Sequence, residues 1–179
     1  PPGFKITSLY RSNGGPGAAR NTGLDSLDKE EVEFVAFLDS DDIWTPHHLS
    51  EGISALGEDG DFYFCDHIRW NQSGTWFSDS KPFQRWLAGE HAMFSSINSN
   101  SDFYQFAPDC ALRAFLMDYL AQTSTVIYRF AKFPCLRFDT ALRHAGEDLM
   151  FWLDLAIRAR NVRFSRRANV TTGEGINMY

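Results

Sequence analysis

A short, almost continuously apolar run at residues 34–38 ends directly in the acidic sequence Asp39-Ser40-Asp41-Asp42. Such a run is typical of a strand that is buried on both faces of a parallel sheet. Ligands of open α/β sheets bind beyond the carboxyl ends of the strands, and the three aspartates stand at such an end. The run therefore predicts a mostly parallel α/β sheet with an acidic site where one strand ends.

The rest of the chain alternates between strand and helix patterns, which favours a βαβ layer. We expect strands at residues 5–10, 32–38, 62–70, 125–128 and 162–164. A further edge strand at 75–77 is expected within a weakly patterned stretch of loops and short helices at 71–109. Helices are expected to begin at Pro16, after Thr45 as N-cap, at residue 111 and near residue 147.

Composition fits one globular domain and excludes several classes of protein. The chain has 179 residues, 44 % of them hydrophobic, and a net charge of −6, which argues against a disordered chain and against a nucleic-acid partner. No apolar run approaches the length of about 20 residues that crosses a bilayer. Three cysteines without CxxC spacing argue against a disulfide framework and a thiolate zinc site, so a reducing compartment is expected.

The acidic cluster needs a nearby positive charge, because carboxylates so close together repel one another. Mg²⁺ and Mn²⁺ would supply it, since they take one or two carboxylates and complete their shells with water and phosphate oxygens. The alternative is a solvated acidic turn that caps the following helix. The spacing excludes a D-x-D-x-[TV] phosphatase motif, because Ile43 follows Asp42, and an EF-hand, because Trp44 stands where that loop needs glycine.

Two other segments could carry chemistry. The glycine-rich turn at residues 13–17 leads into a helix whose backbone N–H groups could meet a phosphate, and Arg20 adds a fixed positive charge. The alternative is that this turn is an ordinary loop that binds no phosphate. Glu147 and Asp148 open the amphipathic helix, where the helix dipole alone would favour them. The functional alternative is that one of the two carboxylates serves as a general base.

Together these segments resemble one family. The patterns N-G-G-x3-A-R-N-x-G, F-L-D-S-D-D-x-W and G-E-D-x3-W, at residues 13–23, 37–44 and 146–152, look like those of the family 2 glycosyltransferases of the GT-A fold. The resemblance implies a single Rossmann-like GT-A domain over residues 1–179, with a mixed, mostly parallel sheet flanked by helices. It also implies an inverting, metal-dependent hexosyltransferase of polysaccharide biosynthesis. Such an enzyme moves a sugar from a nucleotide-sugar donor, commonly a UDP-sugar, to a hydroxyl of a glycan or lipid-linked acceptor.

The resemblance implies a role for each matching residue. Asp41 would ligate the Mn²⁺ or Mg²⁺ that bridges the donor diphosphate, and Asp39 would lie by the ribose or in the metal's shell. Asp148 would take the proton from the acceptor hydroxyl, and Glu147 would support it or touch the acceptor. The loop near the donor nucleotide is matched by Asn13, Arg20 and Asn21.

The family's first strands, which supply the nucleobase half of the donor site, have no counterpart before Ile6. We therefore expect a domain that is incomplete at both ends, inactive by itself and able to self-associate through an exposed sheet edge. Two other functions stay open: a non-catalytic carbohydrate-binding or assembly module of this fold, and a nucleotidyltransferase of similar fold. The expected location is the cytoplasm, with peripheral attachment to the inner face of a membrane left open.

Overall fold

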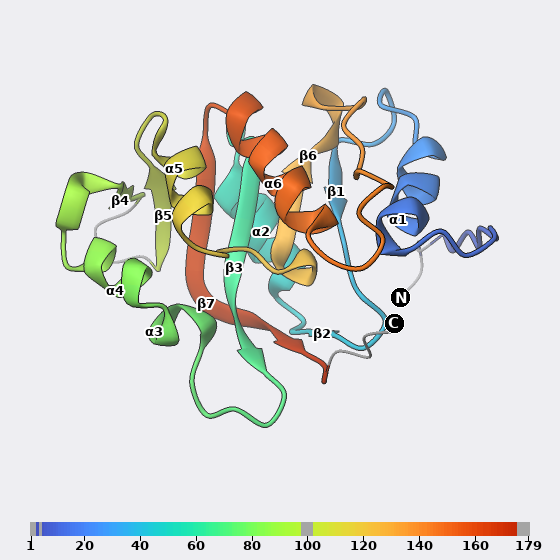
Figure 1. Cartoon of the computed structure of the whole chain (residues 1–179). Helices are drawn as coiled ribbons and strands as arrows, with labels where there is room; N and C mark the ends of the chain where they lie inside the picture. The colour runs from blue at the N-terminus through green and yellow to red at the C-terminus, as the bar shows by residue number, and fades with distance from the viewer. Residues whose placement is uncertain (1–2, 4, 98–101, 175–179) are drawn as a thin grey trace.

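A strand that is buried along most of its length, β3 (Phe62–Arg69), lies in the middle of one sheet (Figure 1). β6 (Val126–Arg129) and β7 (Val162–Thr172) flank β3, whose first six residues are all buried. The other strands are β1 (Phe34–Ala36), β2 (Ile43–Trp44), β4 (Phe94–Ser96) and β5 (Phe103–Phe106). Their order is β1-β6-β3-β7-β5-β4, with β2 paired to β7. This computed structural model describes residues 3, 5–97 and 102–174.

The sheet is mixed, as predicted, but most of its neighbouring strands are antiparallel. The pairings give β1, β3, β4 and β7 one direction and β2, β5 and β6 the opposite one. Within the described residues, β3 and β7 are thus the only parallel neighbours. The prediction of a parallel strand at residues 32–38 is wrong in this respect, because β6 is inserted between β1 and β3 and pairs antiparallel with both. Apolar periodicity carries no information about the direction of a partner strand.

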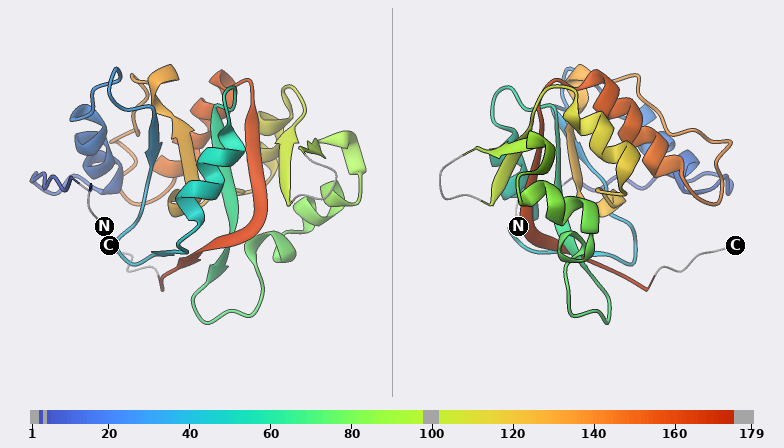
Figure 2. Two further views of the ribbon diagram at one scale, coloured as in Figure 1. Left: turned by 180° about the vertical axis from the view of Figure 1, so that it is seen from behind. Right: turned by 60° about the vertical axis from the view of Figure 1, so that its left-hand side comes forward.

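Helices cover both faces of the sheet (Figure 2). α2 (His48–Leu56) packs on one face, while α5 (Cys110–Met117) and α6 (Glu147–Arg158) lie together on the other. α1 (Pro16–Asp25) lies beside the β1 end of the sheet, and the short helices α3 (Trp76–Asp79) and α4 (Lys81–Leu87) lie at the β4–β5 end. The mixed α/β architecture expected from the sequence is confirmed. No helix in the described part of the chain has the length and apolar character that crossing a membrane requires.

Aromatic side chains fill the core between the sheet and the α5–α6 layer. Trp152, on α6, is fully buried and stacks on Phe62 of β3, with 6.0 Å between ring centroids. Phe62 also stacks on Phe115 of α5, at 5.6 Å. The same core extends to Phe37, just before the acidic turn, whose ring meets that of Phe151 at 6.0 Å. Because rings so packed resist displacement, this core fixes α6 relative to the turn that follows β1.

Two expected elements near the N-terminus differ in the structure. Residues 5–10 form no strand, and Ile6 and Tyr10 are 90 % and 98 % exposed. α2 begins at His48, not directly after Thr45. The Thr45 hydroxyl donates to Asn169 Oδ1 at 3.0 Å, so this side chain joins β7 instead of capping α2.

Two further differences concern strands. Residues 75–77 form no edge strand, because Thr75 caps α3 by accepting from the Ser78 N–H and makes only an isolated bridge to Ile68. The expected strand at 162–164 continues to Thr172, since β7 pairs with β3 from Val162 to Thr172, with two register shifts around Asp66. The sequence did not predict this extension, because the charged arginines of β7 interrupt the apolar pattern that marks a buried strand. The starts of α1 and α6 agree with the sequence.

Candidate active site

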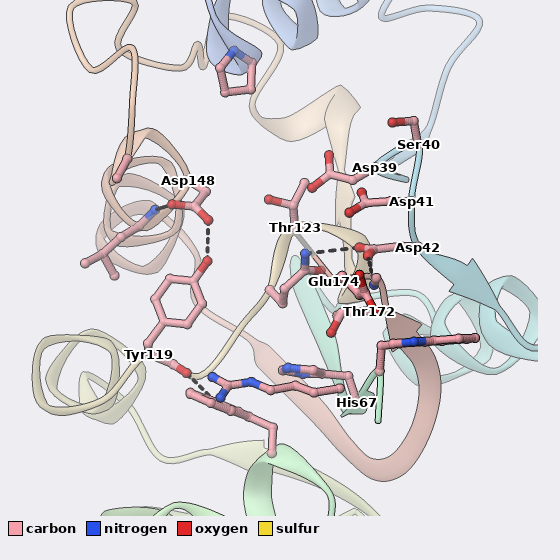
Figure 3. Close-up of a pocket in the computed structure, with 18 of the residues that line it drawn as sticks. Asp39, Ser40, Asp41, Asp42, His67, Tyr119, Thr123, Asp148, Thr172 and Glu174 are labelled. Carbon is pink, nitrogen blue, oxygen red and sulfur yellow. Dashed lines mark hydrogen bonds between the residues drawn. The ribbon is translucent and has the colours of Figure 1, made fainter. Parts of the chain in front are cut away.

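One pocket of about 1230 Å³ opens where β1, β3 and β7 end (Figure 3). These three strands share a direction, so their carboxyl ends lie at the same side of the sheet. The walls come from the start of α1, the acidic turn after β1, the ends of β3 and β7, the segment at 119–123 and the start of α6. All three sequence patterns therefore contribute side chains to this pocket.

The acidic turn is fastened to the segment that precedes β6. The backbone N–H of Asp39 donates to the Ser124 hydroxyl at 2.9 Å, and the Trp44 indole N–H donates to the Ser124 carbonyl at 2.7 Å. Within the turn, the Asp42 N–H donates to the Asp39 carbonyl at 3.1 Å. The aspartate side chains are thus presented to the pocket from a fixed backbone.

Arg20 connects this turn to the start of α6. Its guanidinium binds Asp39 Oδ1 at 2.7 Å and Glu147 Oε1 at 2.9 Å. Burial alone would lower the pKa of Arg20, but the charges and hydrogen bonds of Asp39 and Glu147 outweigh burial and raise it. Glu147 is 6 % exposed, so this ion pair is largely shielded from water.

Two glycines of the N-terminal turn allow this contact. Gly15 precedes α1 with φ +85°, a conformation that other residues rarely adopt. Gly17 lies in the first turn of α1, where a Cβ atom would stand 3.1 Å from Phe138 Cβ and 3.2 Å from Glu147 Cγ. The glycines therefore have a structural role that brings Arg20 to α6.

Asp42 is a half-buried carboxylate of the acidic turn, and both of its oxygens are hydrogen-bonded. Its oxygens accept from the Gly173 N–H at 2.9 Å and from Gln122 Nε2 at 3.1 Å. Burial, with smaller contributions from the charges of Asp39 and Asp41, raises the pKa of Asp42. These bonds hold the end of β7 against the turn, so Asp42 closes one side of the pocket.

Glu147 and Asp148 point in different directions. Glu147 faces Arg20, whereas Asp148 is half-buried in the pocket and accepts a hydrogen bond from the Tyr119 hydroxyl (Figure 3). The other Asp148 oxygen, Oδ1, accepts from the Leu149 N–H at 2.7 Å. Burial, followed by the charge of Asp148, raises the pKa of Tyr119, so the phenol stays protonated and acts as the donor.

The structure does not place every predicted residue in the pocket. Asn13 is exposed, and its Oδ1 accepts from the Gly15 N–H at 3.0 Å. Asn21 donates to the Phe138 carbonyl at 2.9 Å and accepts from the Phe138 N–H at 2.8 Å. Neither asparagine lines the pocket, and Asn21 joins α1 to the loop before α6.

Several pocket residues lie outside the sequence patterns. The Arg69 guanidinium stands 4.0 Å from the centroid of the Trp76 ring, and His67 stacks on the same ring at 5.5 Å. Burial, with help from the Arg69 charge, lowers the pKa of His67 to about 4, so this imidazole is neutral near pH 7. His67 and Arg69 could have been identified, because they occupy alternate positions at the end of a predicted strand. No local signal marks Tyr119, since only the fold brings it to Asp148.

The carboxylates of the acidic turn suit a metal ion that takes only one or two of its ligands from the protein. Across residues 3, 5–97 and 102–174, no three His, Cys, Asp or Glu side chains are grouped closely enough to cage an ion. The Asp41 carboxylate lines the pocket and makes no hydrogen bond or ion pair with another described side chain. Asp39 gives one oxygen to Arg20. This donor set fits Mg²⁺ or Mn²⁺ bound by one or two carboxylates, with the remaining ligands from water and phosphate.

Comparison with known sequences finds one family and a curated relative. The model of glycosyl transferase family 2 matches residues 2–120. The succinoglycan biosynthesis protein ExoW of Rhizobium meliloti (strain 1021) is 32 % identical over 180 residues, covering 98 % of this chain and 53 % of ExoW. The chain thus spans about half the length of this relative.

Comparison with solved structures finds the same fold in TarS of S. aureus. The crystal structure of TarS 1–349 superposes with a TM-score of 0.60 at 23 % identity, covering 92 % of this chain and 42 % of TarS. The structure of TarS 1–349 in complex with UDP gives a TM-score of 0.59 at 23 % identity, covering 94 % of this chain and 43 % of that one. At 23 % identity, this structural similarity establishes the fold of the chain.

Proposed function

This chain belongs to glycosyltransferase family 2, and on that premise we propose that it transfers a sugar from a UDP-sugar to a hydroxyl of a glycan or lipid-linked acceptor, with inversion. One observation carries the proposal: Arg20 joins the acidic turn to the start of α6. The carboxylates of the turn, which suit a donor diphosphate, and Asp148, which suits an acceptor, therefore face the same pocket. The complex of TarS with UDP supports the choice of a uridine nucleotide.

The donor side is assigned to the acidic turn. Asp41, with Asp39 as the second carboxylate, would hold Mn²⁺ or Mg²⁺. When bound, the ion would neutralise the negative charge that develops on the leaving diphosphate. Arg20 would keep Asp39 in place through their ion pair. Its positive charge would lie between the donor carboxylates and the start of α6. Asn13 and Asn21 are left out of this assignment, because their side chains form hydrogen bonds with backbone groups outside the pocket.

The acceptor side is assigned to Asp148. Its carboxylate would take the proton of the acceptor hydroxyl while that oxygen bonds to the anomeric carbon and the bond from this carbon to the UDP oxygen breaks. Glu147 is less suited to this step, because it is buried and bound to Arg20. A general base needs access to the substrate proton, and Asp148 lines the open pocket. Attack from the face opposite the leaving UDP gives inversion.

Calorimetric titration of the full-length protein with UDP, in the presence and absence of Mn²⁺, tests the donor side. We expect Mn²⁺-dependent binding of UDP over GDP and a loss of at least about tenfold in affinity for Asp41→Asn. Asp109→Asn is the matched control, because Asp109 is an exposed aspartate that does not line the pocket. Absence of any metal-dependent binding of UDP or GDP would overturn the donor assignment.

Turnover of a panel of UDP-sugars by the full-length protein, rather than by residues 1–179 alone, separates an enzyme from a binding module. We expect release of UDP by the wild-type protein and a fall of at least about a hundredfold for Asp148→Asn, with UDP affinity retained. Mn²⁺-dependent binding of UDP without turnover would favour the non-catalytic alternative. Normal turnover by Asp148→Asn would exclude Asp148 as the base.

A further inference from the structure

The segment between α5 and β6 brings one side chain to the proposed base. We propose that Tyr119 is the positioning residue for Asp148: its hydroxyl holds one carboxylate oxygen so that the carboxylate faces the acceptor hydroxyl. This inference rests on the proposed function of Asp148 as the general base. Two observations carry it: the hydrogen bond from the Tyr119 hydroxyl to Asp148 Oδ2, and the contacts that hold the rest of Tyr119.

Tyr119 is fixed at its backbone as well as at its hydroxyl. Its carbonyl accepts a hydrogen bond of 2.6 Å from the indole N–H of Trp76. The two rings also meet edge to face, with centroids 6.4 Å apart and an interplanar angle of 88°. A side chain held at both ends has few alternative positions, so its hydroxyl stays directed at α6.

Trp76 is in turn held by the end of β3. His67 stacks on one part of its ring at 5.5 Å, and the Arg69 guanidinium lies 4.0 Å from the ring centroid. Both residues belong to a strand in the middle of the sheet. The position of the Tyr119 hydroxyl therefore depends on a central strand of the sheet.

The hydrogen bonds to Asp148 define the orientation of its carboxylate. Oδ1 accepts from the Leu149 N–H and Oδ2 accepts from Tyr119, so rotation of the carboxylate would break both bonds. A carboxylate has about four acceptor positions, and two are used here. The remaining positions are available to an acceptor hydroxyl in the pocket. A base fixed in this way loses little freedom when the acceptor binds, which lowers the barrier to proton transfer.

Charged and titratable side chains from several elements line the pocket together with Asp148. They are Tyr119 after α5, Glu147 on α6, Arg20 on α1, His144 in the loop before α6, His67 and Arg69 on β3, Asp39, Asp41 and Asp42 in the acidic turn, and Glu174 after β7. Substitution of Tyr119 by Phe removes only a hydroxyl. A change in turnover between the two proteins therefore reports on this one hydrogen bond.

The main test compares Tyr119→Phe with the full-length wild-type protein in UDP-sugar turnover. We expect kcat to fall about tenfold or more, with KM for the UDP-sugar within about twofold, because Tyr119 contacts the base and not the donor turn. Tyr128→Phe is the matched control, because the Tyr128 hydroxyl is buried without a hydrogen-bond partner in the described structure.

The split between kcat and KM distinguishes positioning from a merely structural role. Loss of turnover together with a raised KM for the UDP-sugar and a lower midpoint of thermal unfolding would overturn the inference. A kcat equal to that of the wild-type protein would also overturn it.

A second measurement separates this inference from the proposed function. The ¹³C chemical shift of the Asp148 carboxyl carbon at pH 7 reads the hydrogen bond directly, without any turnover. A changed shift in Tyr119→Phe but not in Tyr128→Phe, with no turnover of any UDP-sugar by the wild-type protein, would sustain the hydrogen bond and reject the enzymatic function. An unchanged shift would reject the role of Tyr119, whatever the activity.

Discussion

Arg20 and Glu147 are 127 residues apart in the chain, and their side chains form an ion pair of 2.9 Å. The same guanidinium binds Asp39, so one cation lies between the acidic turn and the helix that carries Asp148. Because Glu147 is buried, removal of its partner would leave a charge without compensation. This relationship connects the stability of the fold with the geometry of the pocket.

Arg20→Gln should therefore destabilise the protein by about 3 kcal/mol. The reason is that Glu147 and Asp39 would both lose their counter-charge. Urea unfolding at pH 7 measures the effect. In Arg20→Gln/Glu147→Gln part of the loss should return, because no buried carboxylate is left unpaired. Arg113→Gln, on an exposed face of α5, is the control and should change stability by less than about 0.5 kcal/mol. A loss in Arg20→Gln as small as that in the control would contradict the prediction.

Two glycines of α1 should respond in opposite ways to alanine. Gly23→Ala should stabilise the protein by up to about 1 kcal/mol, because alanine favours a helix and nothing lies within 4 Å of the added Cβ. Gly17→Ala should lack this gain, since its Cβ would press against Phe138 and Glu147. UDP-sugar turnover should fall in Gly17→Ala alone. Thermal unfolding and turnover of the pair provide the measurement, and equal effects at the two positions would exclude the tight contact.

His48 should make the protein less stable in mild acid. It is fully buried, stacks on Trp44 at 4.7 Å, and burial lowers its pKa to about 4, against a smaller opposing effect of Glu51. The unfolded chain takes up a proton near pH 6.5 and the folded protein does not, so stability is lost as pH falls from about 6.5 towards 4. Between pH 7 and pH 5 this histidine should account for about 2 kcal/mol.

The measurement is urea unfolding of wild-type protein and His48→Gln at both pH values. The variant should lose about 2 kcal/mol less than the wild-type protein over this interval. His47→Gln, at the exposed neighbouring position, is the control. An identical pH dependence in wild-type protein and His48→Gln would refute the assignment.

Asp61 should stabilise the fold at neutral pH. Burial alone would raise its pKa, but hydrogen bonds from Lys132 and from the N–H groups of Arg160 and Asn161 reverse this effect and lower it. Stability from this carboxylate is therefore present above its ordinary pKa of about 3.9 and is lost as pH falls through the lower value in the fold. Asp61→Asn should cost about 2 kcal/mol at pH 7 and much less near pH 2.

Asp59→Asn is the matched control for Asp61→Asn. The Asp59 side chain is 64 % exposed and pairs with Arg163 at 2.7 Å, so its loss should cost less than about 1 kcal/mol. Chemical unfolding at the two pH values measures both variants. A loss in Asp61→Asn that does not change between them would show that the effect is one of packing and not of charge.

Local sequence patterns identified the elements that carry the pocket. The glycine turn and Pro16 define the start of α1, the apolar stripe defines α6, and the acidic turn follows a strand as predicted. These signals are short-range, because helix and strand periods and capping preferences act within a few residues. For the same reason the sequence predicted Arg20, Asp39, Asp41, Glu147 and Asp148 as candidates, and all five line one pocket.

Only the tertiary structure decided which side chains meet. Asn21 belongs to the same pattern as Arg20, yet it bonds to the backbone of Phe138 while Arg20 binds Asp39 and Glu147. Tyr119 belongs to no pattern and reaches Asp148 because Trp76 and the α5–α6 packing place it there. The insertion of β6 between β1 and β3 is likewise a long-range event. The sequence alone determined the elements and the charges, whereas strand direction and side-chain partners depend on contacts between distant segments, which no local period encodes.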